Sequence, residues 1–270
     1  DYILTVAVSI SAGVAQITSA FPERYEWRVP LALGFVVFMT VVNLRGVKES
    51  GTAFAIPTYV FLAMTLFTLG VGYYRYFTGT LDLVAGVEPM HAEVAQSLTL
   101  FLILKAFSSG CTALTGVEAI SNGIMAFKEP RSRNAGLTLV AMSVILSGLF
   151  FSITFLAREV QAQPSHVETV FSQIGRSIYG AGSPFYLGLL GGTTLILIMA
   201  ANTAYNGFPL LAAMIAADGF LPKQFSYRGS RLVFTYGIVG LAGVAALLIV
   251  IFQAQTTALI PLYAIGVFMS

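Results

Sequence analysis

Long apolar runs, separated by short polar connections, make up most of this sequence. A membrane-spanning helix needs about 20 apolar residues, and about eight runs approach that length. The expected spans are Asp1 to about Ala20, Pro30 to Val42, Ala53 to Tyr73, Leu98 to Phe127, Gly136 to Phe155, Pro184 to Thr203, Phe234 to Phe252, and Ala258 to Ser270. The pattern predicts an all-α membrane protein with a single transmembrane domain over residues 1–270.

The connections between the spans predict an orientation and two additional helices. Those after the second, fourth and sixth spans are richer in Lys and Arg than the others, which places them on the cytoplasmic side. Apolar residues recur at helical spacing from Val167 to Tyr179. We expect a short surface helix there, which either covers an entrance or simply lies at the membrane interface. A second amphipathic helix is expected at Pro209 to Ala217.

Composition agrees with a membrane location and excludes several classes of function. Hydrophobic residues make up 57% of the chain and charged residues 10%, whereas soluble domains carry about 25% charged residues. The net charge of +2 is too small to favour nucleic acid as a partner. Cys111, His91 and His166 do not form a metal-binding pattern, and nucleotide-binding and hydrolase motifs are lacking, so we expect neither an enzyme nor a cofactor. Because the chain begins and ends inside apolar runs, we expect an internal piece of a longer protein.

The fourth span, Leu98 to Phe127, is unusually polar. It contains three glycines, a lysine and a glutamate, which predict a discontinuous helix with a break around Cys111 to Val117. Glu118, deep in the span, can neutralise a bound cation or carry a proton. Lys105 is the candidate partner for a structural ion pair, but it would lie roughly 20 Å from Glu118 along an unbroken helix. The alternative for Lys105 is to extend its charge to the membrane surface.

The first span carries a polar face. Tyr2, Thr5, Ser9 and Gln16 recur at helical spacing, with the carboxylate of Asp1 at the end of the span. Such a face either lines a polar cavity or packs against another helix. These residues are therefore candidates for binding as well as for packing.

Two other spans hold weaker candidates. Asn202, Thr203 and Asn206 lie near the end of the sixth span, where they serve as helix caps or hinge residues as readily as ligands. Tyr263 follows Pro261 by two residues in the eighth span. Its hydroxyl either reaches a cavity or packs at the membrane interface.

Five motifs resemble the amino acid–polyamine–organocation (APC) superfamily, and within it the KUP/KimA-type potassium–proton symporters. They are D-Y-I-L-T-V-A-V-S-I-S-A-G, N-L-R-G-V-K-E-S, A-F-S-S-G-C-T-A-L-T-G-V-E-A-I-S-N, A-A-D-G-F-L-P-K-Q-F and I-P-L-Y-A-I-G-V-F. The resemblance implies a LeuT-like fold of two inverted five-helix repeats, of which this chain corresponds to the third to tenth helices. It also implies that the fourth span is the helix that unwinds at the substrate.

The same resemblance implies a cation site and a function. The implied ligands are Asp1, Tyr2, Thr5, Ser9, Thr115, Glu118 and Tyr263. K⁺ would bind there, and Asp1 and Glu118 would couple its movement to protons. We expect a secondary active transporter in the cytoplasmic membrane that takes up potassium with protons by alternating access. The alternatives are a proton-coupled amino-acid or polyamine permease and, with less support, a channel. A homodimer is an open alternative for its assembly.

Overall fold

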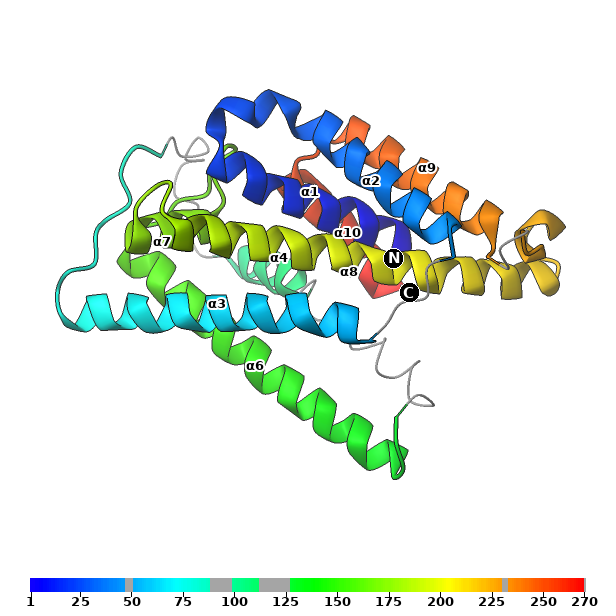
Figure 1. Cartoon of the computed structure of the whole chain (residues 1–270), viewed down its shortest axis with the longest axis horizontal. Helices are drawn as coiled ribbons and strands as arrows, with labels where there is room; N and C mark the ends of the chain where they lie inside the picture. The colour runs from blue at the N-terminus through cyan, green and yellow to red at the C-terminus, as the bar shows by residue number, and fades with distance from the viewer. Residues whose placement is uncertain (47–50, 88–98, 112–126, 230–232, 270) are drawn as a thin grey trace.

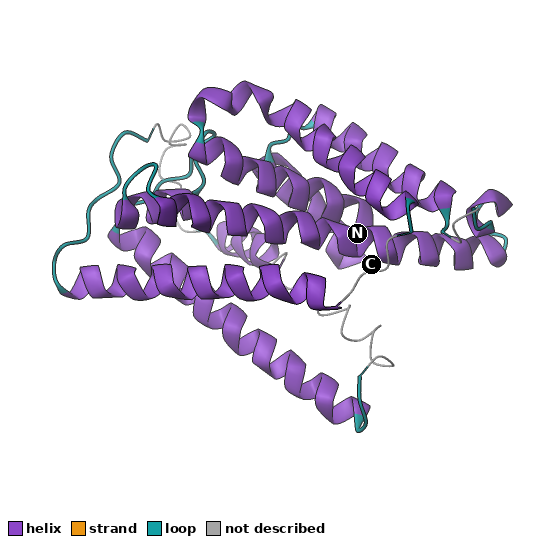
Figure 2. Cartoon of the chain, viewed as in Figure 1, coloured by secondary structure: helices purple, strands orange, loops and turns teal. Residues whose placement is uncertain are grey.

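The computed structural model describes residues 1–46, 51–87, 99–111, 127–229 and 233–269. The helices in these ranges are α1 (Tyr2–Ala20), η1 (Pro22–Trp27), α2 (Arg28–Leu44), α3 (Gly51–Phe77), α4 (Leu100–Cys111), α6 (Arg131–Glu159), α7 (Val170–Tyr179), α8 (Pro184–Ala217), η4 (Lys223–Ser226), α9 (Thr235–Ile251) and α10 (Thr256–Met269) (Figure 1). Figure 2 shows helices and loops, and no strand, in the described ranges. The expected all-α architecture is confirmed.

Eight of the described helices have the composition of membrane spans. Five segments are long and apolar enough to cross a membrane, namely α1, residues 22–44, residues 55–77, α6 and α8. Three shorter apolar helices correspond to α4, α9 and α10. These helices fall on the runs that the hydrophobic pattern marked.

The antiparallel pair of α1 and α8 forms the centre of the bundle (Figure 1). The Thr194 hydroxyl donates to the Gly13 carbonyl oxygen at 3.2 Å, and Gly13 has no side chain to hold the helices apart. Small residues permit such close approach between membrane helices. α2 and α9 cover the pair with a core that includes Val36, Tyr205 and Leu241.

A second, smaller core lies where α3, α6 and α7 meet. Its buried members include Leu69 of α3, Leu156 of α6 and Ile178 of α7. Beyond this contact α6 diverges from the bundle toward Arg131 (Figure 1), and most of its length is exposed. The two cores are joined through α8, which contacts both α1 and α3.

The sixth span differs from its prediction. The sequence suggested a span that ends near Thr203 and a separate helix from Pro209, but α8 is one continuous helix of 34 residues. Pro209 lies inside it, although proline removes one backbone hydrogen bond there. Gly237 of α9 faces Pro209 so closely that a methyl group at Gly237 would lie 2.8 Å from the Pro209 Cα atom. Packing against α1 and α9 therefore keeps the chain helical across the proline.

Other boundaries moved outward from the apolar runs. The predicted loop of residues 23–28 is largely the short helix η1, which continues into α2. α3 and α6 contain 27 and 29 residues, longer than expected, because polar residues at their ends continue the helix beyond the membrane core. α9 agrees with its predicted span to within one residue at each end.

The predicted surface helix is present as α7. It begins at Val170 because Thr169 caps it: the Thr169 hydroxyl accepts a hydrogen bond from the Ser172 backbone N–H at 3.2 Å. Gly180, with φ of +79°, ends the helix in a backbone conformation that favours glycine. Ser172 and Ile174 are almost fully buried, so α7 is packed into the protein rather than lying loosely on a membrane surface.

Candidate functional site

The first turn of α1 meets α10 at two of the predicted site residues. The Thr5 hydroxyl lies 3.5 Å from the Tyr263 hydroxyl oxygen and 3.3 Å from the Asp1 carbonyl oxygen. Both distances are long for a hydroxyl hydrogen bond. The Tyr263 side chain is 4% exposed and therefore faces the protein interior. These oxygens are close together but weakly bonded, so they remain able to accept a cation.

Asp1, whose carbonyl oxygen contacts the Thr5 hydroxyl, also carries a carboxylate. Its Oδ1 atom is buried and has no hydrogen-bond partner among the described residues. Burying a carboxylate oxygen without a partner is costly, and a cation would offset that cost. On α10, a methyl group at Gly266 would lie 3.9 Å from the Asp1 Cα atom, an ordinary contact, and 2.8 Å from Cδ1 of Leu4.

Tyr2 and Ser9 continue the polar face of α1 toward α8. The Tyr2 ring lies against Gly207 in the interior of α8. Ser9 is half-buried one turn beyond Thr5. The structure thus brings Thr5 and Tyr263 together, with the Asp1 carbonyl oxygen beside Thr5. Tyr2 lies at the contact between α1 and α8.

The other two predicted ligands, Thr115 and Glu118, lie outside the described residues, as does the predicted helix break. The described part of their span, α4, contacts α10, the helix that carries Tyr263. Lys105 on α4 has an exposed side chain. An ion pair of Lys105 with Glu118, the alternative that their separation along the span disfavours, involves a residue outside the described part of the chain.

Gln16, the last member of the polar face, has a different role. Its Oε1 atom accepts a hydrogen bond from the Thr169 hydroxyl at 3.1 Å, and the Ser19 hydroxyl oxygen accepts one from the Thr169 backbone N–H at 3.0 Å. The same residue that caps α7 therefore fastens it to α1. We call this end of the bundle the α7 end; Tyr2 lies at the other end of α1.

A charge pair stabilises α7 internally. Arg176 donates two hydrogen bonds to Glu168, both at 3.0 Å, and a third to the Ala85 carbonyl oxygen at 3.1 Å. The Ser172 hydroxyl donates to the same carboxylate at 3.0 Å and lies 2.7 Å from the Tyr186 hydroxyl of α8. A paired arginine fork fixes geometry more firmly than a single contact does. Glu168, Ser172 and Arg176 recur every four residues, so helical spacing marks this part of the network. Ala85 and Tyr186 come from separate segments, and no local pattern marks them.

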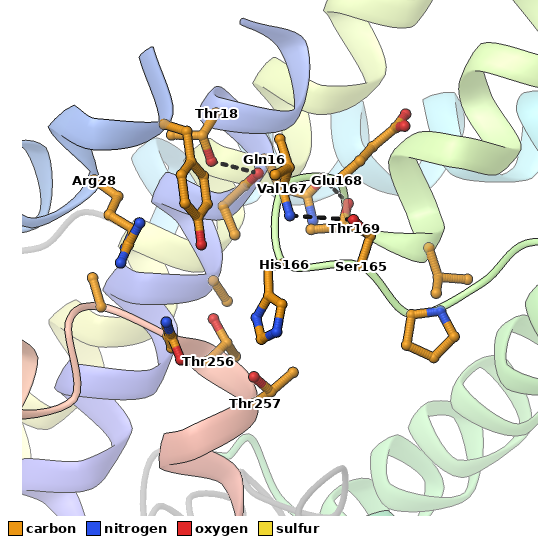
Figure 3. Close-up of a pocket in the computed structure, with 17 residues that line it drawn as sticks. Gln16, Thr18, Arg28, Ser165, His166, Val167, Glu168, Thr169, Thr256 and Thr257 are labelled. Atoms are coloured by element: carbon orange, nitrogen blue, oxygen red, sulfur yellow. Dashed lines mark hydrogen bonds between the residues drawn. The ribbon is translucent and has the colours of Figure 1, made fainter. Parts of the chain in front are cut away.

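A pocket of about 310 Å³ opens at the α7 end, between α1, α10 and the loop before α7. Figure 3 shows His166, which had been assigned no role, pointing from that loop toward Thr256 and Thr257 at the start of α10. Gln16 and Arg28 also belong to the polar lining, as do Tyr25 and Gln255. Arg28 donates to the Gln253 carbonyl oxygen at 2.8 Å, so its charge supports the turn between α9 and α10.

Two partly buried polar contacts join α2 to α8. The Asn43 side-chain amide donates to the Asn202 oxygen at 2.7 Å, and the hydroxyls of Thr40 and Tyr205 lie 3.1 Å apart. Asn202 was expected as a cap, hinge or ligand. It lies inside α8, so the cap assignment is wrong, and its contact with Asn43 is a hydrogen bond between helices.

Comparison of the sequence with known proteins identifies the family of this chain. The sequence profile described as "Amino acid permease" matches residues 1–270. The potassium transporter KimA of Bacillus subtilis is 49% identical over 268 residues, which are 99% of this chain and 44% of that protein. The low-affinity putrescine importer PlaP of Escherichia coli K12 is 25% identical over 83% of this chain and 49% of its own length.

A third relative is the probable potassium transport system protein Kup of Anaeromyxobacter, 26% identical over 84% of this chain and 29% of that protein. The chain spans less than half the length of each of these three relatives. The profile match covers every span described above, including the helices that hold Asp1, Thr5 and Tyr263. The chain therefore belongs to the amino acid permease family of membrane transporters.

Proposed function

We propose that this chain is the central part of a secondary active transporter that takes up K⁺ together with H⁺ by alternating access. The observation that carries the proposal is the buried, unpartnered Oδ1 atom of Asp1, a residue whose carbonyl oxygen lies 3.3 Å from the Thr5 hydroxyl, together with the long contact between the hydroxyls of Thr5 and Tyr263. The name of the relative from Bacillus subtilis, a potassium transporter, supports the choice of cation.

The chemistry of this group suits a monovalent metal cation. A hard cation that loses part of its hydration shell needs oxygen ligands, which hydroxyls, carbonyls and carboxylates provide. One carboxylate 4 Å from the ion contributes roughly 4 kcal/mol at an effective dielectric constant of 20. We assign binding to Asp1, Tyr2, Thr5, Ser9, Thr115, Glu118 and Tyr263, and proton coupling to Asp1 and Glu118.

The remaining features of the proposal concern domain, orientation and assembly. The chain forms one transport domain that corresponds to the third to tenth helices of a LeuT-like fold. The α7 end faces outside the cell, as the distribution of Lys and Arg predicts. Assembly as a homodimer is tested by cross-linking of the purified full-length protein, where a single monomer band would exclude it.

The test of the function is uptake by the full-length protein in liposomes. K⁺ uptake should rise when the outside is made acidic relative to the inside. Glu118→Gln should abolish this dependence on the proton gradient, and K⁺ uptake that Glu118→Gln leaves unchanged would overturn the site assignment. Asp82→Asn serves as the control, since the Asp82 side chain is 81% exposed.

A proton-coupled amino-acid or polyamine permease is the second candidate. Its support is the resemblance to a putrescine importer. Two carboxylates in the assigned site would also suit an organic cation. Labelled putrescine and neutral amino acids in the same liposomes discriminate the two, because uptake of either without K⁺ flux would replace the potassium assignment.

A further inference from the structure

Gly207 of α8 touches a candidate cation ligand. A methyl group in place of one Gly207 α-hydrogen would lie 2.7 Å from Cε1 of the Tyr2 ring, 2.9 Å from Cζ and 3.0 Å from the hydroxyl oxygen. Atoms that are not bonded to one another do not approach this closely without displacement. The Tyr2 ring therefore occupies the space that a side chain at position 207 would need.

The backbone of α8 does not itself require this glycine. Gly207 lies inside a continuous helix and is not among the glycines with positive φ. Glycine in a helix interior costs about 1 kcal/mol relative to alanine. Gly191 in the same helix has nothing within 4 Å of the position of a Cβ atom, so a close contact is not a general property of the glycines of α8.

The contact also differs from the neighbouring one at Gly266. There the obstructing atom is Cδ1 of Leu4, the flexible end of a side chain that can rotate away. At Gly207 the obstruction is the outer edge of an aromatic ring, including the atom that carries the hydroxyl. A substitution at Gly207 must therefore move the Tyr2 hydroxyl itself.

We propose that Gly207 is a positioning residue: the absence of its side chain lets the Tyr2 ring lie against α8 and so sets where the Tyr2 hydroxyl meets the transported cation. This inference rests on the proposed function, because it takes Tyr2 as a ligand. It makes Gly207 a determinant of cation affinity without any contact of its own with the ion.

The test measures the initial rate of K⁺ uptake by the full-length protein in liposomes over a range of K⁺ concentrations. Gly207→Ala should raise KM about tenfold and leave kcat within about twofold. Gly191→Ala, the matched control in the same helix, should leave both constants near those of the parent. A purely structural role for Gly207 would instead lower the amount of active protein with KM unchanged.

A double-mutant cycle shows whether the effect passes through Tyr2. Tyr2→Leu removes both the hydroxyl and the ring edge, so adding Gly207→Ala to it should raise KM no further and should restore any lost folding yield. An unchanged KM in Gly207→Ala, or its full effect in the Tyr2→Leu background, would overturn the inference. A parent protein that takes up no K⁺ would instead overturn the proposed function, and with it this inference.

Discussion

At the scale of single residues, the Thr5 hydroxyl is the most informative group of the candidate site. It has one proton and two acceptors, the Asp1 carbonyl oxygen at 3.3 Å and the Tyr263 hydroxyl at 3.5 Å. Neither bond is strong at these distances. A cation that bound here would gain oxygen ligands while breaking no short hydrogen bond, which lowers the free-energy cost of binding.

Removal of the Tyr263 hydroxyl tests this arrangement. Tyr263→Phe keeps the buried ring but deletes one proposed ligand, so KM for K⁺ should rise about fivefold to tenfold with little change in thermal stability. The measurement is uptake against K⁺ concentration, with the unfolding midpoint of the same preparation. Tyr236→Phe on the exposed side of α9 is the matched control, since Tyr236 is 56% exposed. Equal KM values for the two variants would remove Tyr263 from the site.

At the scale of elements, the junction of α8 and α9 depends on one glycine. Gly237 meets the backbone of Pro209 as well as its ring, and a backbone atom cannot rotate away. The short separation at this point keeps α8 continuous across its proline. Close packing of α8 against α9 therefore compensates for the backbone hydrogen bond that Pro209 removes from α8.

Gly237→Ala should force α8 and α9 apart and destabilise the protein by about 1–3 kcal/mol. Gly243→Ala in the same helix has nothing within 4 Å of its added methyl group. It should be neutral or stabilise α9 by up to about 1 kcal/mol, because alanine is the better helix former. Thermal unfolding of the purified protein in detergent measures both. A Gly237→Ala protein as stable as the Gly243→Ala protein would contradict the close packing.

α7 is the second element whose position rests on one residue. Thr169 caps α7 and contacts both Gln16 and Ser19 of α1, so its hydroxyl serves two helices. Thr169→Ala should lower the stability of the first turn of α7 by about 1 kcal/mol. Thr169→Ser should largely preserve it, since the hydroxyl remains.

Hydrogen exchange of the α7 backbone amides measures this change, with faster exchange expected for Thr169→Ala alone. The exposed Thr78, whose hydroxyl bonds only within its own local segment, provides the matched Thr78→Ala control. Equal protection of α7 in the Thr169→Ala and Thr78→Ala proteins would show that the cap does not hold α7.

At the scale of the whole molecule, α1 links two polar regions that lie at its opposite ends. Its first turn carries the candidate cation ligands, and its last turns hold α7 through Gln16 and Ser19. α8 runs antiparallel beside it along its whole length (Figure 1) and contacts α7 as well. The candidate cation site and the pocket at the α7 end are therefore connected through the same helix, α1.

Binding of the transported ion should stabilise the whole bundle. A ligand that binds only the folded state contributes about 2.7 kcal/mol at a concentration one hundred times its Kd. We expect K⁺ to raise the unfolding temperature and Na⁺ at equal ionic strength to raise it less. Asp1→Asn should abolish the difference between the ions, while Asp82→Asn should retain it. The same increase with both salts in the parent protein would indicate a general salt effect.

The sequence predicted the positions of some candidate residues correctly but not the partners of all of them. The resemblance correctly brought Thr5 and Tyr263 to one place although 258 positions separate them, but their assigned role as ligands stays a prediction. The polar face of α1 was recognised by spacing, yet Gln16 on that face binds α7. Helical spacing specifies which side chains share a face but not how many partners that face meets.

The sequence by itself determined the membrane class and most of the described helices with their approximate ends, although it divided α8 in two and missed η1. This is possible because an apolar run of about 20 residues must satisfy its backbone hydrogen bonds internally in a membrane, whatever surrounds it. Only the tertiary structure decided that α8 continues through Pro209, that Asn43 meets Asn202, and that the Tyr2 ring rests on Gly207. Those contacts depend on how closely two distant helices approach and on which faces they present, and no local pattern in either helix encodes that distance.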